Sequence, residues 1–260
     1  MLADATLLGA PAWVGLLVLG LAGAVAGVIN TIAGGGSLLA LPVLVALGLP
    51  PGVANGTMRV GVAVQNVTSA LTFHSRGVRQ YGLVLRLVLP MVLGAAVGTV
   101  LATRLPDDAL RVVFGAMLAG WAVALVLRPG RFLHPPEHPR PAGPVALGLA
   151  LLIGLYGGFL QAGVGFPMLA LLVLYLGHSP VHANAAKVVL ILAYTAISLP
   201  LFALAGQVAW REGLVLAAGS MAGGWLGAHL QLRAGAKLVR WVVVVAVGIS
   251  GIAMLRGALG

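Results

Sequence analysis

Apolar residues run along this chain in long stretches, which short polar or glycine- and proline-rich pieces interrupt. A helix needs about 20 apolar residues to cross a lipid bilayer, and eight stretches approach or exceed that length. These predicted long helices are residues 11–33, 53–73, 82–103, 108–127, 145–162, 182–205, 212–230 and 235–255. Two shorter apolar pieces, residues 38–49 and 166–177, give each half of the chain five helical segments. The pattern predicts an all-α polytopic membrane protein.

Composition supports the membrane class and removes several others. The 260 residues are 60% hydrophobic and 8% charged, and the mean hydropathy is +1.08. The net charge of +10 is spread between the apolar runs, so it indicates loop placement at a membrane rather than nucleic-acid binding. The chain has no cysteine, which excludes disulfides and cysteine-ligated metals. No cofactor and no metal site are expected.

A glycine-rich break recurs in the two halves. Gly34, Gly35 and Gly36 are expected to interrupt a helix, with Ser37 as the N-cap of the short segment that follows. The same pattern returns 129 residues later, where Gly163, Gly165 and Asn184 correspond to Gly34, Gly36 and Asn55. The repeat register also relates the G-x-x-x-G pairs Gly94/Gly98 and Gly223/Gly227. We interpret both pairs as sites of ordinary close helix packing rather than as a dimerisation face.

Loop charges predict that the two repeats are inverted. The basic loop 73–86 and the linker 128–144 are expected to be cytoplasmic, whereas in the second half the basic loop is the next one, at residues 233–240. Equivalent loops therefore lie on opposite sides, with broken or re-entrant short helices after each break. The predicted domains are a first transmembrane repeat (1–127), a cytoplasmic linker (128–144) and a second transmembrane repeat (145–260). Both termini are predicted to be non-cytoplasmic.

Interrupted helices in matching positions point to a substrate site at the repeat interface near the bilayer midplane. The glycine breaks offer backbone N–H groups to an anion, and Arg59 and Lys187 are charged residues within apolar spans. Simpler alternatives are helix crossing at the glycines, interhelical hydrogen bonds for the amides and snorkelling of the two cations. The candidate substrate-binding residues are Gly34, Gly35, Gly36, Ser37, Asn55, Arg59, Gln65, Gln161, Gly163, Gly165, His182, Asn184 and Lys187.

The acidic residues are few and fall outside the spans. All five (Asp4, Asp107, Asp108, Glu137 and Glu212) lie in predicted loops or at span ends, so no carboxylate is available in mid-membrane as a proton relay or cation cage. His182 is the candidate for titration near neutral pH. His134 and His138 are spaced like metal ligands, but they lie in a proline-rich linker. An enzyme is not expected, because no nucleophile with a base is evident.

These motifs resemble the sulfite exporter TauE/SafE family of membrane transporters. The resemblance rests on AGGGSLLALPVL at residues 33–44, PPGVANGTMR at 50–59, and AGVGFPML and HANAAK in the second half. It implies two homologous halves and a secondary transporter of small sulfur-containing anions, such as sulfite or organosulfonates. A related thiosulfate-handling branch uses cysteines, which this chain lacks.

The function predicted from the sequence is alternating-access transport of a small sulfur-containing anion across the cell membrane. A passive anion channel, an intramembrane enzyme and a non-transporting assembly subunit are the alternatives. The expected partners are the anionic substrate and the lipid bilayer, with no nucleic acid. Homodimerisation is left open.

Overall fold

The computed structural model describes residues 11–127 and 140–233, and every regular element within these ranges is a helix. The first half contains α1 (Ala12–Ile32), α2 (Ser37–Ala46), α3 (Pro51–Ser75), α4 (Tyr81–Arg104) and α5 (Asp107–Leu127). The second half contains α6 (Pro144–Phe159), α7 (Gly165–Leu169), the π-helical η3 (Ala170–Tyr175), α8 (Pro180–Leu204) and the helix Trp210–Arg233. The predicted helix 235–255, residues 128–139 of the linker and Asp4 lie outside the described residues.

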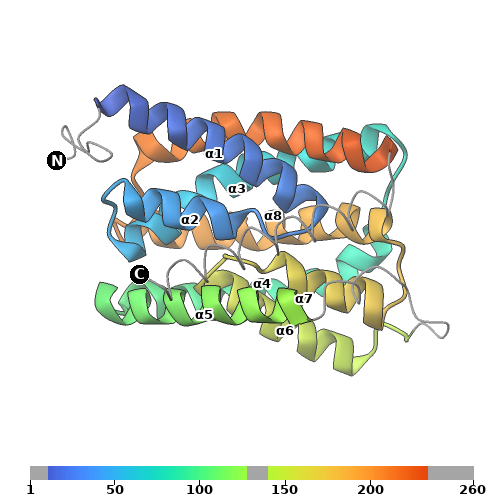
Figure 1. Ribbon diagram of the computed structural model, residues 1–260. Helices are drawn as coiled ribbons and strands as arrows, with labels where there is room; N and C mark the ends of the chain where they lie inside the picture. The colour runs from blue at the N-terminus through green and yellow to red at the C-terminus, as the bar shows by residue number, and fades with distance from the viewer. Residues whose placement is uncertain (1–10, 128–139, 234–260) are drawn as a thin grey trace.

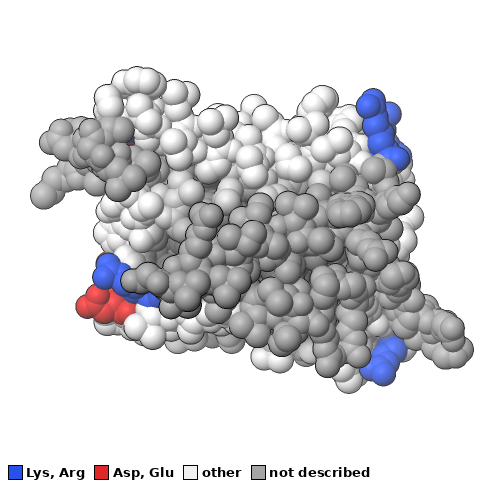
Figure 2. Space-filling model, in the orientation of Figure 1, with Lys and Arg blue, Asp and Glu red and all other residues white. Residues whose placement is uncertain are grey.

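The all-α membrane class is confirmed. Four described helices are long and apolar enough to cross a bilayer: Trp13–Ile32, Tyr81–Arg104, Pro180–Leu204 and Trp210–Arg233. The long helices lie side by side along one common direction (Figure 1). On the face shown in Figure 2, the described Lys, Arg, Asp and Glu side chains lie at the two ends of that direction, and the described part of the surface between them is uncharged. This is the surface that a lipid bilayer requires.

The outward face of α4 carries a stripe of exposed apolar side chains. The exposed fractions of Leu85, Leu89, Leu93, Val97 and Leu101 are 74, 65, 54, 54 and 50%. These residues recur at every fourth position, so they form one stripe along the helix. An exposed stripe of large apolar side chains is unfavourable in water and suits hydrocarbon. The stripe therefore marks the lipid-facing side of α4.

Two helical hairpins enter the molecule from opposite ends. The first is α1 followed by α2, which ends beside the start of α3, and the second is α6 followed by α7 and η3 (Figure 1). The backbone N–H of Arg140, just before α6, donates to the carbonyl of Tyr175 at 3.1 Å, so η3 returns to the end where α6 began. Opposite entry is compatible with the inverted repeat, and that relation between the halves stays a prediction.

The G-x-x-x-G glycines pack helices of opposite halves against each other. A Cβ added at Gly94 would lie 2.1 Å from the Leu151 carbonyl oxygen on α6, so α4 and α6 are in backbone contact. A Cβ added at Gly223 would lie 2.1 Å from the Ala24 oxygen, which places the helix Trp210–Arg233 equally close to α1. Both motifs thus serve packing within the chain, as the sequence analysis interpreted them.

Two local predictions at the breaks were wrong in detail. Ser37 is not an N-cap: Gly36 holds that position without a side-chain cap, and Ser37 is the first residue of α2. Its hydroxyl instead contacts the other half of the chain. The helix predicted at 145–162 ends at Phe159, because Gln161 and Gly163 adopt left-handed φ angles of 61° and 75° that no α-helix continues through.

The contact between α4 and α6 gives a stability prediction. In Gly94→Ala the new methyl group would overlap the α6 backbone, and relieving the overlap by parting the helices should lower the free energy of unfolding by about 1–3 kcal/mol. Gly115→Ala on α5 is the matched control, because nothing lies within 4 Å of the added Cβ. Thermal unfolding of the two variants in detergent checks this. Equal midpoints for both variants would refute close backbone packing at Gly94.

Candidate functional site

The two helix breaks meet in backbone contact. A Cβ at Gly34 would lie 2.4 Å from the Gly165 Cα, and a Cβ at Gly165 would lie 2.1 Å from the Gly34 Cα. Gly34 also has a φ of 83°, a conformation that side-chain-bearing residues rarely adopt. Gly34 therefore requires glycine for the turn, and both positions require glycine for the close crossing of the two segments.

Ser37 and Phe166 connect the two breaks further. The Ser37 hydroxyl accepts a hydrogen bond from the Gly163 N–H at 3.2 Å and donates to the Gln161 carbonyl at 3.4 Å. The Phe166 ring lies over Gly35, where an added Cβ would come within 2.5 Å of the ring. The first turn of α2 is thus covered by the second break.

Arg59 and Asn55 on α3 bind the carboxyl end of α6. The Arg59 Nη2 donates to the Gly158 carbonyl at 2.6 Å, and its Nη1 donates to Gln161 Oε1 at 3.1 Å. The Asn55 amide donates to the Phe159 carbonyl at 2.7 Å. The last carbonyls of a helix lack intrahelical partners and carry partial negative charge. A cation and an amide from the first half therefore cap the broken helix of the second.

Lys187 and Asn184 on α8 do the same for α1. The Lys187 Nζ donates to the carbonyls of Asn30 and Thr31 at 2.8 and 3.1 Å, and the Asn184 amide donates to the Ile32 carbonyl at 2.8 Å. Arg59 and Lys187 are both fully buried. The snorkelling alternative is therefore wrong for both cations, because neither reaches the ends of the molecule.

The amide side chains near the breaks form a polar network. Asn30 donates to Gln65 Oε1 at 2.6 Å, and Gln65 donates to the Thr31 hydroxyl at 3.0 Å. Tyr194 stands at the repeat position of Gln65 and donates to Gln161 Oε1 at 3.0 Å. These bonds hold the ends of α1 and α6 against α3 and α8.

The structure gathers all but one of the predicted site residues. The glycines and polar side chains named in the sequence analysis are buried around the two breaks, whereas His182 is exposed at the start of α8 and contacts Ser179 Oγ at 2.8 Å. Tyr194 and Phe166 also lie at the breaks, although the list of candidate substrate-binding residues does not include them. Phe166 directly follows a break glycine, and an aromatic residue beside a glycine turn is the sequence signal for its position.

An aromatic pair also supports the second break. Trp121 Nε1 on α5 donates to the Tyr156 hydroxyl at 2.7 Å, and that hydroxyl donates to the Ala162 carbonyl at 2.5 Å. The Trp121 ring packs on Phe166 with 5.2 Å between ring centroids. Nothing in the sequence around Trp121 indicated this role.

Several buried polar groups on α3 and α8 have no partner among the described residues. The side-chain atoms of this kind include Arg59 Nε, Asn55 Oδ1, Asn184 Oδ1, Asn66 Oδ1 and Thr195 Oγ1. The four acceptors form two pairs whose members are 129 positions apart. The N–H groups of Gly35 and Gly36 likewise make no backbone hydrogen bond within the described ranges. Buried polar groups are normally satisfied, so these atoms mark where water or a ligand would bind.

The cavity at the first break is small. It measures about 10 Å³ and is bordered by Asn30, Ser37, Gln65 and Ser220. This is room for about one water molecule and is too small for an anion of several heavy atoms. Among the residues that the structure describes, no cluster of three His, Asp or Glu side chains is placed to hold a metal ion.

Helical hairpins that break in the middle of a membrane bundle, with buried cations at the breaks, define a multi-pass membrane protein of the transporter class. The chain belongs to the sulfite exporter TauE/SafE family, whose model matches residues 19–254. The prediction of this family from the sequence is confirmed.

Curated relatives share most of their length with this chain. A probable membrane transporter protein of Haemophilus influenzae is 31% identical over 237 residues, covering 88% of this chain and 90% of the relative. A probable membrane transporter protein, ORF9, of Sinorhizobium is 28% identical and covers 85% of each chain. The probable membrane transporter protein YfcA of Escherichia coli K12 is 26% identical, covering 90% and 87%. No solved structure matches the chain significantly.

Removing the amine that caps α1 gives a second stability prediction. Lys187→Met removes the donor to the Thr31 carbonyl and leaves the Asn30 carbonyl with the Gly34 N–H alone. A buried carbonyl that has lost its donor should lower the free energy of unfolding by about 1–3 kcal/mol. Arg211→Met, which removes an exposed cation at the end of the molecule, should leave it within about 0.5 kcal/mol. Thermal unfolding in detergent compares the two. A Lys187→Met protein as stable as the parent would argue against the capping role.

Proposed function

We propose that this protein is a secondary transporter that moves small sulfur-containing anions, sulfite or an organosulfonate, across the cell membrane by alternating access. The observation that supports this most is the meeting of the two helix breaks, where donors of both halves are buried together. Substrate would bind there, between the break of the first hairpin and that of the second. The inverted relation of the repeats and the non-cytoplasmic termini belong to the same proposal.

The electrostatics of the breaks favour an anion. Arg59 and Lys187 place two cations in the centre, whereas Asp107, Asp108 and Glu212 lie at the ends of helices. The first turn of α2 adds backbone N–H groups and the positive end of a ten-residue helix. The donors without a partner, Arg59 Nε and the Gly35 and Gly36 amides, would bind a sulfite or sulfonate oxygen.

The close packing of the breaks favours a carrier that must move. Phe166 covers Gly35, and Gly34 touches Gly165, so a substrate enters only when α2 and α7 separate. Because the two hairpins come from opposite ends, displacing one would open the site towards one side of the membrane while the other hairpin stays closed. That is the motion that alternating access requires.

The class of substrate rests on the family. The family's description names a sulfite exporter, and the pyramidal oxyanion of sulfite or a sulfonate head group presents three oxygens to N–H donors. Arg59 offers a planar fork that suits paired oxygens, whereas Lys187 offers a point charge. Substrate oxygens would take over part of the hydrogen bonding that the α6 and α1 carbonyls now provide.

Uptake of radiolabelled sulfite into liposomes tests the proposal. Arg59→Gln should reduce the rate of saturable uptake about tenfold or more, because a lost hydrogen bond to a charged group costs about 1.5–3 kcal/mol. Arg59→Lys keeps the positive charge but lacks the planar pair of N–H donors, and it should retain part of the activity. Arg211→Gln, an exposed cation away from the breaks, should transport like the parent.

Folding and mechanism are checked in the same preparations. Size-exclusion profiles and thermal unfolding must show that each variant is folded before its flux is compared. Internal unlabelled sulfite should accelerate uptake of labelled sulfite, since a carrier exchanges substrate across the membrane. Electrical current that does not saturate, without such exchange, would instead identify a channel. Uptake by a folded Arg59→Gln protein at the parent rate would remove Arg59 from the site.

A further inference from the structure

Two adjoining cavities lie at the end of the molecule where α3 ends and α4 begins. One has a volume of about 240 Å³ and the other about 380 Å³. Arg79 and Gln80, in the turn between the two helices, and Tyr81, the first residue of α4, line both cavities. None of the predicted substrate-binding residues borders either one. The pair is therefore separate from the helix breaks.

The larger cavity is basic. Its arginines come from three places: Arg79 from the α3–α4 turn, Arg86 from α4 and Arg140 from the segment before α6. Arg140 is held in place, because its guanidinium lies 5.0 Å from the centre of the Tyr175 ring and its backbone N–H binds the Tyr175 carbonyl. No acidic side chain is among the described residues that line this cavity.

A histidine of the larger cavity contributes little charge at neutral pH. Burial lowers the pKa of His178, and the neighbouring His182 lowers it further. The imidazole of His178 is therefore neutral there, and the three arginines supply the positive charge. Oxyanions such as phosphate are the ligands that several arginines bind best.

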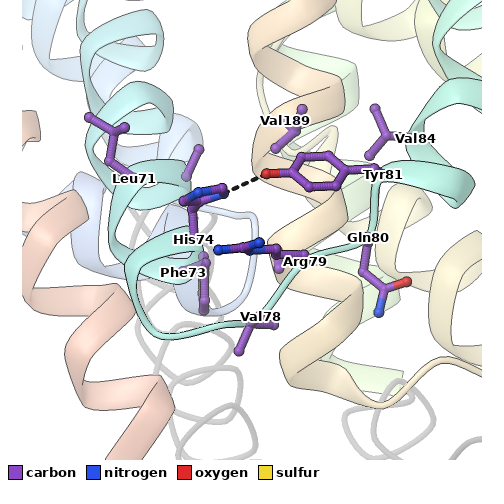
Figure 3. Close-up of a pocket in the computed structure, with 11 residues that line it drawn as sticks. Leu71, Phe73, His74, Val78, Arg79, Gln80, Tyr81, Val84 and Val189 are labelled. Atoms are coloured by element: carbon purple, nitrogen blue, oxygen red, sulfur yellow. Dashed lines mark hydrogen bonds between the residues drawn. The ribbon is translucent and has the colours of Figure 1, made fainter.

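The smaller cavity is mostly apolar. Leu71, Phe73, Val84 and Val189 line it, and Figure 3 shows them around the His74–Tyr81 pair. The Tyr81 hydroxyl lies 2.5 Å from His74 Nδ1, and the Arg79 side chain extends towards His74 (Figure 3). Leu71 is 64% exposed, so an apolar chain would reach this cavity from the bilayer.

We propose that the two cavities together bind one anionic phospholipid, with its phosphate among Arg79, Arg86 and Arg140 and an acyl chain along the apolar cavity. The basic compartment matches the charge of the head group, and the apolar compartment beside it matches the tail. The basic turn lies at the end predicted to be cytoplasmic, where anionic head groups attract basic residues. This assignment does not depend on which solute the protein transports.

Lipid binding to the purified full-length protein tests the proposal. In a neutral detergent, phosphatidylglycerol should raise the thermal unfolding temperature and should remain bound in native mass spectra, whereas phosphatidylcholine should do neither. Each of Arg79→Gln, Arg86→Gln and Arg140→Gln should weaken phosphatidylglycerol binding about fivefold. Arg76→Gln is the matched control, because Arg76 is exposed just after α3 and lines neither cavity.

Two further experiments test whether the acyl chain occupies the apolar cavity and whether the bound anion is a lipid head group or a free oxyanion. Leu71→Ser should weaken phosphatidylglycerol binding while the protein stays folded, because Leu71 is largely exposed already. Free glycerol phosphate and free sulfite at the same concentration should not reproduce the effect of the lipid. If either free anion stabilises the protein as well as phosphatidylglycerol does, the occupant is a soluble oxyanion and the lipid assignment fails. Equal binding of both lipids, or equal effects of Arg76→Gln and the three cavity variants, would also overturn it.

Discussion

The arrangement at the two breaks depends on one constraint: a helix that ends in a buried, apolar interior leaves carbonyls that its own backbone cannot satisfy. α1 and α6 both stop there, and each needs donors for its last turn. Arg59 supplies them to α6 and Lys187 to α1, with Asn55 and Asn184 beside them. Each cap comes from the opposite half of the chain. Neither broken helix is therefore complete without the other half, although the two breaks lie 129 residues apart in sequence.

The glycine contacts, like the caps, hold the two halves of the chain together. α4 of the first half packs on α6, and the helix Trp210–Arg233 of the second half packs on α1, in both cases at backbone distance. Each broken helix is thus held by a cation at its end and by a long helix of the other half along its side. A motion that opens the centre must either keep both glycine contacts or break both of them. This makes α2 and α7 with η3, which are shorter, the segments best suited to move.

Much of this could be predicted from the sequence, for physical reasons. Apolar stretches long enough to cross a bilayer fix helices such as α4 and α8, and the glycine run after α1 fixes a break because only glycine suits that backbone. The partners of Arg59 and Lys187 were not predictable, since a charge in an apolar span indicates burial without showing which helix end it faces. The Ser37 prediction failed for the same reason. A serine after glycines normally caps its own helix. Here its hydroxyl instead donates to a carbonyl and accepts from an amide of the other half of the chain.

The caps also bear on how an anion could be transported through such a centre. Two buried basic side chains would bind a free anion too tightly to release it, unless other groups share their charge. In this structure the carbonyls of α6 and α1 already share it. In the proposed transport, an arriving anion would exchange with those carbonyls instead of meeting unpaired charges, so its net binding free energy would be modest and its binding reversible. The same exchange would loosen the ends of the broken helices while substrate is bound, which couples occupancy of the site to the mobility of the hairpins.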